Sequence, residues 1–220
     1  MDDSKWPARA SLPIAQPGLK FIIIAILITG MLFYFGWMGF SFLSLGITLF
    51  VAWFFRDPDR TPPEGENNLI SPADGKVIVI DKLQGCEYLA GPCIKVSIFM
   101  NVFNVHVNRM PFEGEIEKVL YHPGKFVNAS FDKASTHNER NALIIKTAGN
   151  QRFAVVQIAG LIARRIVNCA KVGDVLNKGD RYGMIQFGSR LDLYLPADFN
   201  VEVQIGDKTT AGSTIIGVMK

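Results

Sequence analysis

The sequence of 220 residues has few groups that bind metals or form covalent cross-links. It contains three histidines and three cysteines, and neither a Cys-x-x-Cys nor a His-x-x-x-His pair is present. Because zinc sites and metal hydrolases use such short spacings, no bound metal is expected. The odd number of cysteines, Cys86, Cys93 and Cys169, favours reduced thiols, as in the cytoplasm.

Two common signatures of nucleotide and ester chemistry are also missing. The chain has neither the Gly-x-x-x-x-Gly-Lys-Ser/Thr pattern that binds phosphates nor Gly-x-Ser-x-Gly. Their absence weakens nucleotide-driven and lipase-like functions. The net charge is only +3, and no run of lysine or arginine suggests a nucleic-acid groove, so nucleic acid is not an expected partner.

What the sequence does have is one long apolar block, residues 21–55, in which no side chain is charged. At about 1.5 Å per residue the block would form a rod of roughly 50 Å, whereas one bilayer crossing needs about 20 residues. We therefore predict a transmembrane or re-entrant helical hairpin that turns near residues 36–39, with a single tilted span as the alternative. Lysines and arginines flank the block on both sides. By the positive-inside tendency, both ends face the cytoplasm at the cell membrane.

The remaining chain divides into two short segments and one domain. Residues 1–20 form an N-terminal cytoplasmic segment, and residues 56–68, rich in proline and charge, form a linker. Residues 69–220 contain short runs of β-branched and aromatic residues separated by Gly, Pro, Asn and Asp. The expected fold class is therefore a predominantly β (β-rich α+β) soluble domain with few, short helices.

A weak internal repeat lies in the last third of the chain. Its first copy comprises Gly173-Asp174, Gly179-Asp180 and Gly183, and its second comprises Gly206-Asp207, Gly212-Ser213 and Gly217. The pattern predicts paired hairpin repeats, in which these residues form turns between short strands. Gly212-Ser213 then corresponds to a turn, whereas the other Gly-Ser pair, Gly188-Ser189, has no counterpart in the repeat.

Gly188-Ser189 stands inside an otherwise strand-like run, residues 182–196. A glycine within a strand needs a reason. One interpretation is a β-bulge, in which Ser189 is an ordinary strand residue. The other is chemical, because a glycine carbonyl has no flanking side chain to obstruct attack by the hydroxyl of the next residue.

Three further segments carry more polar residues than strand packing requires. Asp74 lies in a turn within residues 71–76, and His106 alternates onto one face with Asn104 and Asn108. The third segment, residues 124–141, is rich in Asn, Lys and acidic groups. Taken singly, the simplest interpretations are a turn, a structural histidine and a solvated loop.

Taken together, these segments resemble the phosphatidylserine decarboxylase family in its short, membrane-associated form. The resemblance rests on residues 71–76, 104–111, 121–128 with 138–141, 160–166, and above all Phe187-Gly188-Ser189-Arg190. Longer members carry two histidines in the segment matching 104–111 and a Leu-Gly-Ser-Thr cleavage motif. Here His106 matches the first histidine and Arg109 replaces the second, so the Asp-His-Ser relay of those enzymes does not transfer intact.

The resemblance implies an enzyme that is made as a precursor. Ser189 would attack the Gly188 carbonyl, and the resulting ester would be converted to a pyruvoyl group, leaving chains 1–188 and 189–220. This covalent pyruvate cofactor would condense with the amine of phosphatidylserine, or of an archaetidylserine-type lipid. It would then accept the electrons left by carbon dioxide, and an ethanolamine phospholipid would be released.

The resemblance also implies roles for other residues. Asp74 or His106 would be the base for self-cleavage, and His106 would protonate the carbanion. Arg164 and Arg165 would pair with the lipid phosphate, and Asn104 would help to bind substrate. The expected partners are the phospholipid, the membrane and, by family analogy, a second copy of the chain in a homodimer.

Without the family resemblance, the residues are also compatible with two other functions. One is an uncleaved, membrane-tethered β binding module, in which the Gly-Asp repeats form turns and Ser189 stays intact. The other is a membrane serine hydrolase, in which Ser189 keeps its hydroxyl and a histidine approaches it.

Overall fold

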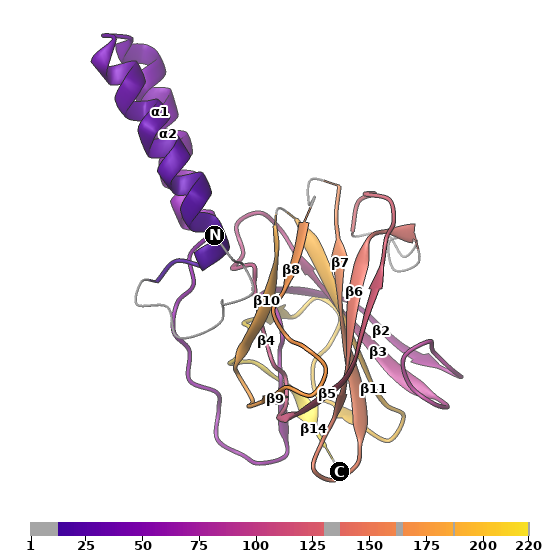
Figure 1. Ribbon diagram of the computed structural model, residues 1–220. Helices are drawn as coiled ribbons and strands as arrows, with labels where there is room; N and C mark the ends of the chain where they lie inside the picture. Colours follow the sequence, from indigo (N-terminus) through magenta and orange to yellow (C-terminus); the bar gives the residue numbers. More distant parts are fainter. Residues whose placement is uncertain (1–12, 130–136, 162–164, 187, 220) are drawn as a thin grey trace. The chain divides into compact units, whose positions relative to one another are not determined.

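The computed structural model describes residues 13–129, 137–161, 165–186 and 188–219, and the chain forms two compact units, residues 1–59 and 60–220. In the first unit, a short 3-10 turn, η2 (Gln16–Gly18), leads into helices α1 (Leu19–Tyr34) and α2 (Met38–Phe54). The two helices lie side by side as a hairpin (Figure 1). This confirms the predicted helical hairpin.

Polar contacts in the hairpin are concentrated between its two helices. The Thr29 hydroxyl lies 2.7 Å from that of Ser44 and 3.0 Å from that of Thr48. Most of the large apolar side chains point outward instead. The helical stretch from Gln16 to Tyr34 is long and apolar enough to cross a membrane, whereas α2 is shorter than a typical span.

The second unit is built mainly of antiparallel strands in three sheets, which confirms the predominantly β prediction. The main sheet has the order β13 (Lys208–Thr209), β2 (Gly75–Leu83), β3 (Cys93–Met100), β11 (Ser189–Pro196), β7 (Arg152–Ala159), β6 (Arg140–Lys146), β5 (Gly114–His122), β9 (Val175–Leu176). The second sheet has the order β4 (Val107–Arg109), β10 (Arg181–Gln186), β8 (Arg165–Asn168). The third has the order β1 (Asn68–Ile70), β14 (Ile215–Val218), β12 (Asn200–Val201).

One large apolar core joins the three sheets. It contains Leu69 from β1, Val77 from β2 and Tyr182 from β10, all fully buried. Strand β11 lies in the middle of the main sheet, between β3 and β7 (Figure 1). Its alternate residues Leu191 and Leu193 belong to this core, because successive side chains of a strand point to opposite faces.

The predicted repeat turns are present and share one geometry. Gly173, Gly179, Gly206 and Gly212 all have positive φ, between 76° and 105°, which glycine adopts without strain. In each Gly-Asp turn the Asp carboxylate accepts a 2.8 Å hydrogen bond from the backbone N–H three residues earlier. In the fourth turn the Ser213 N–H bonds to the Thr210 carbonyl, as Asp180 does to Asn177. Gly212-Ser213 is therefore a turn, as predicted.

Candidate active site

Gly188 and Ser189 lie where the chain passes from the second sheet into the main sheet. Strand β10 ends at Gln186, and β11 begins at Ser189. Phe187 lies outside the described residues. Gly188 is half-buried and has φ +67°, a left-handed conformation that side chains disfavour. Backbone geometry therefore favours glycine at the residue before Ser189.

Ser189 lies in the interior, within the main sheet. It pairs with Met100 of β3 on one side and with Ala159 of β7 on the other, and it is fully buried. Its hydroxyl oxygen has no hydrogen-bond partner among the described residues. An unsatisfied buried hydroxyl costs about 1–3 kcal/mol, so a native protein that keeps one needs a reason for it.

The Gly188 carbonyl packs against the chain at Gly160. The antiparallel register that pairs Ser189 with Ala159 brings Gly188 beside Gly160, the residue after β7. A Cβ atom on residue 160 would lie 2.2 Å from the Gly188 carbonyl oxygen. Only a residue without a side chain fits there.

A pocket of about 240 Å³ opens next to Gly188. Three chain segments line it with Gly188: Phe99, Asn101 and Val102; Asn128 and Ala129; Gly160 and Leu161. Its surface is mainly apolar, with two asparagines. Such a cavity can admit a small group to the peptide bond between Gly188 and Ser189.

His106 lies beside the strand that leads into this junction. It is fully buried and directly precedes β4, whose Val107 pairs with Met184 of β10. Its Nδ1 lies 3.0 Å from the Asn104 carbonyl oxygen. A carbonyl only accepts hydrogen bonds, so in the neutral ring Nδ1 carries the proton and Nε2 is a proton acceptor.

Asn104 shapes a turn at the edge of the pocket. Its side-chain oxygen accepts a 2.9 Å hydrogen bond from the Asn101 N–H, and its own N–H donates to the Asn101 carbonyl at 3.1 Å. The side chain therefore closes the turn at residues 101–104, which contributes Asn101 and Val102 to the pocket.

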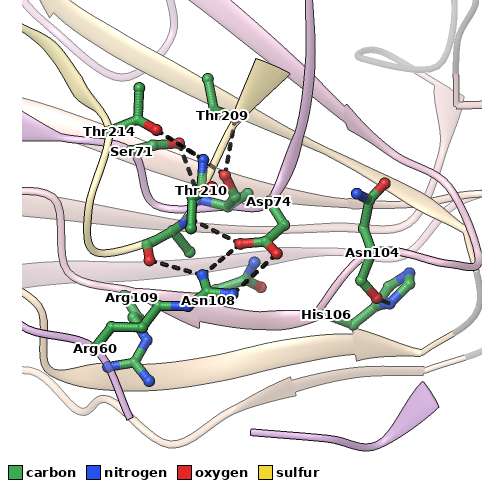
Figure 2. A network of polar contacts seen from close by, with 12 residues as sticks. Arg60, Ser71, Asp74, Asn104, His106, Asn108, Arg109, Thr209, Thr210 and Thr214 are labelled. Carbon is green, nitrogen blue, oxygen red and sulfur yellow. Dashed lines mark hydrogen bonds and ion pairs between the residues drawn. The ribbon is translucent and has the colours of Figure 1, made fainter. Parts of the chain in front are cut away.

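Asp74 belongs to a different polar network, shown in Figure 2. Its carboxylate forms a two-point ion pair with Arg60, in which Nη2 lies 3.0 Å from Oδ2, and accepts a 2.8 Å bond from the Ala211 N–H. Arg60 also donates to the Ala211 carbonyl at 2.7 Å. The pair thus ties the start of the domain and the turn before β2 to the turn at residues 209–214. Nothing in the sequence indicates this contact, because Arg60 is one of several charged residues in the segment that follows the apolar block.

The three arginines singled out in the sequence differ in setting. Arg165 is exposed at the start of β8, where it pairs with Gln186, two residues before Gly188. Arg164 lies outside the described residues. Arg109 is buried, and its guanidinium donates to the Gly179 carbonyl at 3.1 Å, so it braces a repeat turn.

Sequence reasoning missed Gln157, which links Asn108 to Asn141 through buried amides on the face of the main sheet that carries Ser189; Asn141, expected in a solvated loop, is buried in β6. Gln157 donates to the Asn108 side chain at 2.9 Å and accepts from Asn141 at 3.4 Å. The Asn108 amide in turn contacts the sulfur of Met100, the cross-strand neighbour of Ser189. Gln157 and Asn141 each interrupt an otherwise apolar strand, which is the signal that could have found them.

Arg190 and Asp192 form a fully buried ion pair on β11, with Nε–Oδ1 at 2.5 Å and Nη2–Oδ2 at 2.9 Å. Strand alternation points them away from the face that carries Ser189. Arg190 is adjacent to Ser189 in sequence, but its charge is compensated by Asp192 and its side chain lies on the other face of the sheet.

Comparison with known proteins identifies the family of this chain. The chain matches the model of the phosphatidylserine decarboxylase family over residues 47–217. It is 49% identical over 207 residues to the phosphatidylserine decarboxylase proenzyme of Syntrophus aciditrophicus (strain SB), covering 93% of this chain and 96% of that protein. It is 47% identical over 207 residues to the proenzyme of Geotalea uraniireducens (strain Rf4), covering 94% and 97%. Over these lengths such identities show common descent, and the chain belongs to the phosphatidylserine decarboxylase family.

Proposed function

We propose that this chain decarboxylates phosphatidylserine, using a pyruvoyl group that it makes by cleaving itself between Gly188 and Ser189. The observation that carries the proposal is the buried Ser189 hydroxyl, which has no hydrogen-bond partner among the described residues and directly follows a left-handed glycine. The name "proenzyme" given to the relatives supports a precursor that is processed.

The surroundings of Ser189 fit a pyruvoyl group. Residue 189 is the first residue of β11, which lies between β3 and β7, so the sheet would fix the position of a group formed there. The pocket beside Gly188 would admit the substrate headgroup. When formed, this group supplies an electrophilic carbonyl for the substrate amine and a sink for the electron pair left by carbon dioxide.

Self-cleavage requires one nucleophile and one base. Ser189 Oγ loses its proton to the base and bonds to the Gly188 carbonyl carbon; the C–N bond then breaks, the nitrogen takes up a proton, and an ester remains. Removal of the Ser189 Cα proton next breaks the Cβ–Oγ bond and releases the Gly188 carboxylate. The dehydroalanine left behind takes up water and loses ammonia, which yields the pyruvoyl end of chain 189–220.

His106 is the better of the two candidate bases. The contact of its Nδ1 with the Asn104 carbonyl directs Nε2 to act as the proton acceptor. Asp74 instead directs its carboxylate to Arg60 and the Ala211 N–H, so we assign it a positioning role at the start of β2. His106 would then also return a proton to the substrate after carbon dioxide leaves.

The remaining expected roles concern the lipid. Arg165 is exposed and pairs with Gln186, two residues before the cleavage junction, so it would bind the lipid phosphate together with Arg164. Asn104 would help to bind substrate by shaping the turn that borders the pocket. The apolar hairpin would hold the enzyme at the cell membrane, with the β domain on the cytoplasmic side.

The proposal is tested by measuring carbon dioxide release from phosphatidylserine with the purified full-length protein. We expect turnover that sodium borohydride or phenylhydrazine abolishes, because both react with the pyruvoyl carbonyl. Inhibition by a fluorophosphonate, with no effect of either carbonyl reagent, would instead indicate a serine hydrolase.

A further inference from the structure

Three apolar side chains are exposed around the pocket at Gly188. Phe103 is 63% exposed, Leu161 65% and Val127 36%. Leu161 lines the pocket, Phe103 follows the lining residue Val102, and Val127 precedes the lining residue Asn128. We call these three residues the apolar rim. Single exposed apolar residues are ordinary, but a group around one pocket marks an interaction surface.

Hydrogen bonds hold the segments of the apolar rim in place. The buried Asn138 side chain donates to the carbonyls of Val127 and Ala159, both at 2.7 Å, and accepts from the Val127 N–H at 3.1 Å. It thereby ties Val127 to Ala159 at the end of β7, which is followed by the lining residues Gly160 and Leu161. The side chain of Asn101 accepts a 2.9 Å bond from the Phe103 N–H and fixes the third segment.

The charges near the apolar rim favour an anionic surface. Lys125 and Arg165 are exposed on the flanking segments. The stretches 101–105, 124–129 and 160–168 contain no Asp or Glu. An acidic residue, Glu139, is bonded to this border through its N–H, which donates to the Lys125 carbonyl at 3.1 Å, but Glu139 is partly buried whereas Lys125 and Arg165 are exposed. Exposed basic residues beside exposed apolar side chains are typical of surfaces that bind anionic membranes.

The size of the pocket also favours a membrane as the partner. At about 240 Å³ it is smaller than the roughly 300–1,000 Å³ of pockets that enclose drug-sized ligands. It can take a headgroup but cannot enclose a diacyl lipid. The acyl chains of the proposed substrate must therefore stay in the bilayer while its headgroup reacts, which requires the mouth of the pocket to lie at the lipid surface.

We propose that the apolar rim inserts into the interfacial region of the bilayer and presents the Gly188 pocket to lipid headgroups. This inference rests on the proposed function. It adds a second membrane contact, on the β domain itself, to the one expected from the hairpin.

The test uses full-length protein with Phe103→Ser, alone and combined with Val127→Ser. The matched control is Val172→Ser, because Val172 is equally exposed, at 64%, but lies far from the pocket. Its turn is bonded to Ile116, at the end of the main sheet where β7 starts, whereas the pocket lies where β7 ends at Ala159. Each variant is assayed with phosphatidylserine in bilayer vesicles and with a short-chain phosphatidylserine below its critical micelle concentration. Self-cleavage in each variant reports folding.

We expect Phe103→Ser to cut vesicle turnover at least about tenfold, with self-cleavage and turnover of the short-chain lipid within about twofold of wild type. Phe103→Leu should restore vesicle turnover, and Val172→Ser should change neither rate. Unchanged vesicle turnover in the double variant, or an equal loss with both lipids, would overturn the proposal. Failure of the wild type itself to turn over either lipid would refute the proposed function instead.

Discussion

The carbonyl oxygen of Gly188 occupies the space that a side chain on Gly160 would fill. A Cβ atom at position 160 would lie 2.2 Å from that oxygen and 3.1 Å from the carbonyl carbon. These are the atoms that change geometry when a hydroxyl attacks the peptide bond. The end of β7 is therefore shaped around the carbonyl at which cleavage is proposed.

The first prediction concerns this contact. Gly160→Ala should slow self-cleavage at least about tenfold, because overpacking costs roughly 1–3 kcal/mol and each 1.4 kcal/mol on a barrier is a factor of ten. The measurement is a time course of precursor loss on denaturing gels. Hydroxylamine, which cleaves esters, should not accelerate precursor loss, because the defect precedes ester formation.

Gly114→Ala is the control for a general packing defect. A Cβ at Gly114 would lie 2.6 Å from the Ile145 side chain and 2.7 Å from the Lys146 carbonyl oxygen, at the end of the main sheet opposite Ala159. It should lower the free energy of unfolding without slowing cleavage in the folded protein. If both variants slow cleavage equally, Gly160 has no special role.

The second prediction concerns the base. His106→Gln should slow self-cleavage by about 10²-fold or more, the usual contribution of a general base, while the protein remains folded. Precursor half-life is the quantity to compare, with circular dichroism to verify folding. Cleavage at the wild-type rate in His106→Gln would remove His106 from this role.

The third prediction concerns Asp74 and Arg60, whose side chains are both largely buried. Removing one partner of a buried ion pair leaves an uncompensated charge, so Asp74→Asn or Arg60→Gln should each lower the free energy of unfolding by roughly 2–4 kcal/mol. The double variant should lose less than the sum of the two. Urea titration of each variant in the Ser189→Ala background measures this without interference from cleavage. Additive losses would show that the pair is not coupled.

The fourth prediction concerns thiol reactivity. Burial, and secondarily the neighbouring Cys86 thiol, raises the pKa of Cys93 to about 12. Alkylation requires the thiolate, so at pH 8 Cys93 is protonated and should resist iodoacetamide in the folded protein, but react once urea unfolds it. Peptide mass spectrometry quantifies the labelling. Rapid labelling of Cys93 in the native protein would contradict the burial that we describe.

The overall architecture could be predicted because it depends on local patterns. An uncharged apolar block too long for one crossing favours a hairpin over a single span, and short apolar runs separated by turn residues predict a β domain. The repeat turns were predictable for the same reason, since each Gly-Asp pair sets its own geometry.

The candidate site was less predictable because its contacts join distant segments. No local pattern indicates that Gly160 meets Gly188 or that Arg60 pairs with Asp74, since both contacts depend on strand register and chain packing. The proposed catalytic roles of Ser189 and His106 came from resemblance to a family, and they remain predictions.

Intact mass spectrometry of the purified full-length protein, beside Ser189→Ala, tests the central claim most directly. We predict that the wild type consists of chains 1–188 and 189–220. The smaller chain should be lighter, by the mass of ammonia, than the same segment with an N-terminal serine, and reducible by borohydride. Ser189→Ala should remain one chain. A folded wild-type protein that stays a single intact chain would contradict self-cleavage and favour an uncleaved membrane-tethered binding module.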